Sequence, residues 1–154
     1  MATAKEIEKK IIDSLPEIEK IGYDSELIAA QRSLELLFAR TFAAPGDGVR
    51  DVDNAKLKPY TLPYAKWRAK RGYQIKNKDL QVTGALHESI QVGSSDGRPA
   101  LGFLTERSTL IATYQEEQQG NIIFSLNAEE VEEVKKTIAE FAINRMSEIV
   151  KTWS

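Results

Sequence analysis

The 154-residue sequence contains no cysteine and only one histidine, His87. Without cysteine the chain cannot form disulfides, thiolate zinc sites or a cysteine nucleophile. With one histidine it cannot build a multi-histidine metal site by itself. The G-x-S-x-G, P-loop and dinucleotide-binding patterns are also missing. We therefore expect a protein that is not an enzyme and binds no cofactor, with His87 at the surface or hydrogen-bonded.

Long apolar runs are absent as well. No stretch approaches the roughly 20 apolar residues that span a bilayer, and residues 1–15 alternate charged and apolar side chains, unlike a signal peptide. We expect no membrane partner. Hydrophobic residues make up 42% and charged residues 29% of the chain, which is typical of globular proteins, and the length favours a single domain over residues 1–154.

Acidic residues are missing from one segment, residues 56–78. This segment carries 8 Lys/Arg and no Asp/Glu, whereas residues 1–55 have a net charge of −4 and residues 79–154 a net charge of −6. A basic block between two acidic blocks indicates a negative partner, either nucleic acid or the acidic part of a second copy.

The N-terminal third has the periodicity of helices. A first helix is expected from Ala4 to about Asp13, a second from a Ser14 cap to Gly22, and a third from Asp24 or Ser25 to about Ala43. Residues 1–22 are interpreted as a helical extension. Residues 45–61 contain turn formers and predict a long loop that orders on assembly.

Shorter elements are expected in the rest of the chain. The pattern predicts a basic helix at Leu62–Lys70 that stops at Gly72, and a last helix capped by Asn127. Between them it predicts strands at Leu86–Gly93, Ala100–Thr105, Thr109–Gln115 and Ile122–Leu126, with a turn at Ser94–Gly97. The resulting class is α+β, with N-terminal helices, a small antiparallel sheet and a C-terminal helix packed on the sheet.

The basic segment is the strongest candidate for a functional site. In the predicted helix the spacing buries Tyr64 and Trp67 and displays the cations. Three interpretations stay open: a solvated face, a protein interface, or a nucleic-acid site that combines phosphate contacts with aromatic stacking. The candidate interface or DNA-facing residues are Lys66, Arg68, Lys70, Arg71, Lys76 and Lys78.

The acidic start of the last helix is a weaker candidate. Glu129, Glu132 and Glu133 share a helix face, but complementation of the helix dipole explains them without a metal ion. Since no EF-hand spacing accompanies them, we expect no metal site.

Several motifs occur in an order that resembles a known family. The segments are Tyr64–Lys70, which is compared with a Y-x-x-x-K pattern followed by further basic residues; Leu80–Ile90, which reads LQVTGALHESI; Tyr114–Gly120; and Phe124–Glu130, which opens the last helix. Over roughly residues 30–145 this arrangement resembles the tail-completion, virion-morphogenesis and head–tail joining proteins of tailed bacteriophages. The Gln119–Phe124 segment departs from the family pattern, which has an Arg-Pro there. The motif that carries the resemblance comprises Leu80, Thr83, Gly84, Leu86, Ser89 and Ile90.

The resemblance implies a structural virion protein without catalysis. Such proteins form rings, commonly sixfold, between the portal and the tail, and contact other neck and tail proteins while DNA passes through the lumen. The implied location is the virion neck, after assembly in the cytoplasm of the host bacterium. Thr83 and Gly84 are expected to set a turn rather than to contact a partner.

Overall fold

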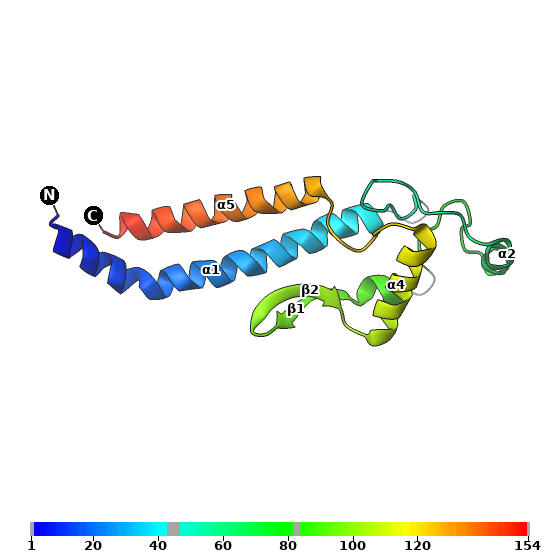
Figure 1. The fold of residues 1–154 in the computed structure, drawn as a ribbon, viewed down its shortest axis with the longest axis horizontal. Helices are drawn as coiled ribbons and strands as arrows, with labels where there is room; N and C mark the ends of the chain where they lie inside the picture. Colours follow the sequence, from blue (N-terminus) through cyan, green and yellow to red (C-terminus); the bar gives the residue numbers. More distant parts are fainter. Residues whose placement is uncertain (1, 43–46, 82–83, 154) are drawn as a thin grey trace.

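The computed structural model describes residues 2–42, 47–81 and 84–153, and combines helices with a small antiparallel sheet. The expected mixed class is therefore confirmed. Helix α1 (Ala4–Thr41) and helix α5 (Ala128–Lys151) lie side by side and antiparallel, so both chain ends lie at one tip of this helix pair (Figure 1). The shorter elements gather toward the other end, with helix α2 (Leu62–Lys70) farthest from the tip.

The expected breaks in the N-terminal helix are wrong, because α1 is continuous across both of them. Ser14 does not cap a new helix. Its Oγ donates to the Lys10 carbonyl at 2.8 Å and accepts from Trp153 Nε1 at 3.1 Å. Pro16 removes only one helical hydrogen bond, and Gly22 has no atom crowding it. Packing against α5 therefore outweighs two local stop signals, and residues 4–22 extend the same helix.

Helix α5 begins where the sequence predicts. The Asn127 side chain accepts from the Glu130 amide, and the Glu130 carboxylate accepts from the Asn127 amide, both at 2.9 Å. The same carboxylate forms a buried ion pair with Arg40 at 2.8 Å, and Arg40 also donates to the carbonyls of Arg50 and Ile123. This pair joins the start of α5 to the end of α1.

The sheet consists of β1 (Ile90–Ser95) and β2 (Arg98–Phe103), paired antiparallel with Ser95 opposite Arg98. Asp96 and Gly97 make the two-residue turn, both with positive φ, which is the favoured geometry for such hairpins. The expected strand at Leu86–Gly93 is wrong in its first half, because Ala85–Glu88 forms a short helix, α3. Helix α1 contacts both strands.

Two expected strands do not form. Residues Thr109–Gln115 lie inside helix α4 (Glu106–Gln119), which is capped by the Thr105 hydroxyl and ends at left-handed Gly120. Residues Ile122–Leu126 form no strand, because the amides of Ile123 and Phe124 donate to Glu116 Oε1, each at 2.9 Å. A carboxylate of α4 thus takes the place of a neighbouring strand.

The core is small and divided. One cluster joins Leu37, Phe42 and Ile90, and a second joins Val49, Leu57 and Ile123. The second cluster contradicts the expectation that residues 45–61 order only on assembly. Of these, residues 47–61 contain no helix or strand, yet they already pack on the single chain and do not await assembly.

Candidate functional site

Helix α2 has the bounds that the sequence predicts, with Pro63 near its start and left-handed Gly72 just beyond its end. It stands at the end of the molecule away from the α1–α5 tip (Figure 1). Its cations are therefore available to a partner, with one exception.

The exception is Arg68, and its expected role at the surface is wrong. Its side chain is only 1% exposed and pairs with Asp79, with Nη2 3.1 Å from Oδ1. It also donates to the carbonyls of Gln74 at 3.1 Å and Gln81 at 3.3 Å. The guanidinium lies 4.5 Å from the ring centroid of Tyr60. Arg68 therefore holds the chain that follows α2 against the helix and does not face a partner.

Asp79 accepts hydrogen bonds from several side chains of this region. Besides Arg68 it accepts hydrogen bonds from Tyr60 Oη at 2.9 Å and Gln74 Nε2 at 2.6 Å. Burial, together with the neighbouring Asp79 carboxylate, raises the pKa of Tyr60 to about 12. The Tyr60 phenol therefore stays protonated and keeps donating over the physiological pH range.

The aromatic residues of α2 are more exposed than predicted. Tyr64 is 40% and Trp67 37% exposed, so neither is buried. Tyr64 and Tyr73 both stack on Trp67, with centroids 5.4 and 6.2 Å away, and the Arg71 guanidinium lies 4.2 Å from the Trp67 centroid. The rings thus pack on one another along the surface instead of entering a core.

The remaining cations divide among different surfaces. Lys66 and Lys70 are exposed on α2 and form no ion pair or hydrogen bond within the described residues. Lys76 borders a small hollow beside Arg40 and Arg50, whereas Lys78 borders a large groove. The basic segment therefore does not form one continuous patch.

The motif that carries the family resemblance includes the start of helix α3 and the start of β1. Gly84 has a φ of 78°, a left-handed conformation that glycine adopts without strain. Leu86, Ser89 and Ile90 are buried, and the Ser89 hydroxyl donates to the Leu86 carbonyl at 2.9 Å. Gly84 thus precedes the short helix α3, which leads directly into β1. Leu80 lies at the edge of the groove with a φ of 57°, and Thr83 lies outside the described residues.

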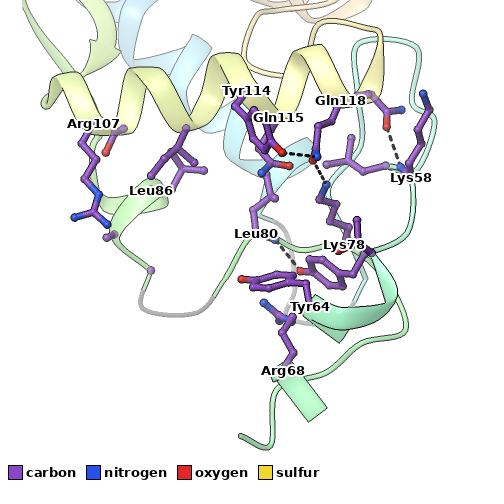
Figure 2. Close-up of a pocket in the computed structure, with 18 of the residues that line it drawn as sticks. Lys58, Tyr64, Arg68, Lys78, Leu80, Leu86, Arg107, Tyr114, Gln115 and Gln118 are labelled. Carbon is purple, nitrogen blue, oxygen red and sulfur yellow. Dashed lines mark hydrogen bonds between the residues drawn. The ribbon is translucent and has the colours of Figure 1, made fainter. Parts of the chain in front are cut away.

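A groove of about 1040 Å³ separates α4 from residues 57–64 and 78–80. Figure 2 shows Arg107 near one end of α4, with Lys58 and Lys78 toward the other end. Leucine and isoleucine line its apolar part at Leu57, Leu80, Leu86 and Ile111. Among the described residues that line it, none is acidic.

Lys78 is the least solvated of the groove's lysines. Its Nζ donates to Gln118 Oε1 at 3.2 Å and lies 6.0 Å from the Tyr60 ring centroid (Figure 2). Burial lowers the pKa of Lys78, because no carboxylate compensates for the lost hydration. On the same wall, Gln115 Oε1 is buried and accepts no hydrogen bond within the described residues. The groove thus presents uncompensated cations and a free acceptor beside apolar surface.

Sequence reasoning missed this groove, because it treated one wall as a strand. Arg107, Tyr114, Gln115 and Gln118 reach the groove only if residues 106–119 are helical. The local signal was present: Thr105 followed by Ser108 is a helix cap, and Gln115–Gln119 are helix formers ahead of Gly120.

His87 and the acidic residues are the remaining candidates. His87 lies against Phe38 and stacks on Phe42, with centroids 4.4 and 4.3 Å away, and is a packing residue. Within the described residues no group of His, Asp and Glu could hold a metal ion, and no helix is long and apolar enough to cross a membrane. Comparisons with family models, curated proteins and solved structures find no match to this chain.

Proposed function

We propose that this chain is a structural subunit of a tailed-bacteriophage neck, which forms a ring joining the head portal to the tail. The family resemblance of Leu80–Ile90 supports this function; in the structure Gly84 is left-handed, and Leu86 and Ile90 are buried. In this proposal the chain acts without catalysis, in the virion, after assembly in the host cytoplasm. Its partners are copies of itself in a ring, commonly sixfold, and other neck and tail proteins.

The observation that carries the proposal is the excess surface of the single chain. It exposes 10297 Å², whereas a compact monomer of 17.3 kDa exposes about 7,800 Å². A ring subunit with two neighbours buries about 800 Å² against each. The excess is large enough for both interfaces.

Both helices of the α1–α5 pair expose apolar side chains. Ile7, Ile11, Ile12 and Leu15 are exposed on α1, and Ile143 and Val150 on α5. Two paired helices cannot cover all of these faces alone, and a larger exposed apolar surface typically marks an interaction site. Assembly would cover them.

The test is complementation in the phage that encodes this chain. A knockout should leave filled heads and separate tails, and the wild-type gene should restore joined particles. Lys66→Glu/Lys70→Glu should fail to restore them while the purified variant keeps its urea midpoint, because both lysines are exposed. The matched control is Lys20→Glu/Lys136→Glu, which has the same charge change on exposed residues of α1 and α5. Joined particles from the knockout would refute the neck function.

A second candidate function is nucleic-acid binding through residues 56–78. The exposed Tyr64 and Trp67 beside Lys66, Lys70 and Arg71 favour it, because stacking platforms combine aromatics with cations. However, Trp67 is already stacked by its own neighbours. Titration with single-stranded and duplex DNA should show a steep salt dependence if phosphates are contacted. Absence of binding at low salt would remove this function.

A further inference from the structure

The groove between α2 and α4 lacks a negative partner. Lys58, Lys78 and Arg107 line it, and within the described residues none of the three forms an ion pair. Lys78 is half-buried without an anion, which is costly, whereas Lys58 and Arg107 are exposed. The groove is therefore suited to a ligand that brings carboxylates. Because leucine and isoleucine line the rest, that ligand must also bring apolar side chains.

A surface of this composition exists on the chain itself, near the N-terminus of α1. Glu8, Ile12, Leu15 and Glu19 follow one another at i, i+4, i+7 and i+11, which places them on one helix face. We call this set the tip ridge. Ile12 is 55% and Leu15 44% exposed, and Glu8 and Glu19 form no ion pair within the described residues.

Residues at the two ends of each surface have the same spacing along their helix. Glu8 and Glu19 are eleven helical residues apart, about 16 Å along the axis. Arg107 and Gln118, which binds Lys78, are also eleven residues apart on α4. A helix laid along the groove could therefore bring both carboxylates to cations while Ile12 and Leu15 meet Leu80 and Ile111.

The two surfaces cannot meet within one chain. Leu15 is separated from the end of α1 at Thr41 by about 39 Å of helix. Helices α2 and α4, which contribute to the groove lining, lie at that end of the molecule (Figure 1). The occupant must come from a second copy. Such a contact joins two different surfaces, and repetition of it makes a closed ring or an open filament.

We propose that the tip ridge of one copy docks in the α2–α4 groove of the next, as the contact that builds the ring. This inference rests on the proposed neck function and names its subunit interface. The α1–α5 helix pair then extends from each subunit to its neighbour.

Disulfide trapping tests the contact in the full chain, which has no cysteine of its own. Ile12→Cys and Ile111→Cys change residues that are 55% and 39% exposed, so folding is retained. Oxidising a mixture of the two single variants should give a cross-linked dimer, and the double variant should give a ladder of oligomers, because disulfides need Cα atoms within about 7 Å. The control is Leu110→Cys mixed with Ile12→Cys; Leu110 is 68% exposed and does not line the groove.

Exchanging the charges of the two surfaces is the second test. Glu8→Lys/Glu19→Lys should lower the cross-linking yield about tenfold at low salt, since two attractions become repulsions. Lys78→Glu/Arg107→Glu in the partner should restore it. The contact would be overturned if Leu110→Cys gave the same cross-linking yield as Ile111→Cys, or if the charge substitutions left the yield unchanged. If the cross-link forms but particles lack the chain, the neck function fails and the contact stands; if the neck location holds without the cross-link, only this contact fails.

Discussion

Replacing Arg68 with methionine should destabilise the fold, although Arg68 belongs to a basic helix and would ordinarily be treated as a surface residue. Methionine replaces the aliphatic part of the arginine side chain and removes the guanidinium, and with it the ion pair with Asp79 and the donors to Gln74 and Gln81. Asp79 would remain buried without its counter-charge.

The expected loss in the free energy of unfolding depends on the hydrogen bonds that Asp79 keeps. Removing one partner of a buried ion pair costs about 3–5 kcal/mol. Since the Asp79 carboxylate still accepts from Tyr60 Oη, Gln74 Nε2 and the Gln81 amide, we expect the lower end, about 3 kcal/mol. At an m-value of about 2 kcal/mol/M this lowers the urea midpoint by roughly 1.5 M.

Urea unfolding followed by circular dichroism measures this loss. Arg71→Met is the control: it removes an exposed cation beside Trp67 and should cost only about 0.5–1 kcal/mol. Arg68→Met with Asp79→Asn should cost less than the two single changes together, because the charges are coupled. A loss below about 1 kcal/mol for Arg68→Met would refute the structural role that we assign to it.

Three further predictions concern the rest of the fold. Burial acts to raise the pKa of Asp51, but hydrogen bonds from Gln119 and the Ala55 and Asp53 amides outweigh it, so the pKa is lowered from 3.8. The stability that the Asp51 carboxylate contributes is therefore present above pH 3.8 and is lost as pH falls through the folded pKa. Urea midpoints should fall less below pH 3.8 for Asp51→Asn than for wild type. Glu130→Gln keeps the helix cap but removes the charge that meets Arg40, and should cost about 3 kcal/mol in urea unfolding; an unchanged midpoint would contradict the buried pair. Gly84→Ala should cost about 1 kcal/mol through backbone strain, since no atom lies within 3.4 Å of the added methyl group, and a stabilised variant would show that the φ of 78° is not held.

Local signals explain which elements the sequence could predict. Helix α2 was predicted to the residue because Pro63 and Gly72 act within one turn of its ends. Asn127 and Glu130 likewise mark the start of α5. The hairpin turn is encoded in the adjacent Asp96 and Gly97.

The missed features depend on distant contacts. Ser14 and Pro16 resemble a new helix start, but the Trp153 indole takes the Ser14 hydroxyl, and that contact spans nearly the whole sequence. The Ile122–Leu126 strand was lost to the Glu116 side chain in the same way. Arg68 differs from Lys66 and Lys70 in being buried opposite Asp79, which periodicity cannot reveal. The groove was missed because it needs α4 as a helix.

The central claim is that this chain is a ring-forming subunit of a phage neck. The most direct measurement is the copy number and position of the chain in purified particles of the phage that encodes it, from quantitative mass spectrometry and electron microscopy of particles with a labelled chain. We expect a fixed number per particle, consistent with one ring, located at the head–tail junction. Infectious tailed particles that contain no copies of the chain would contradict it.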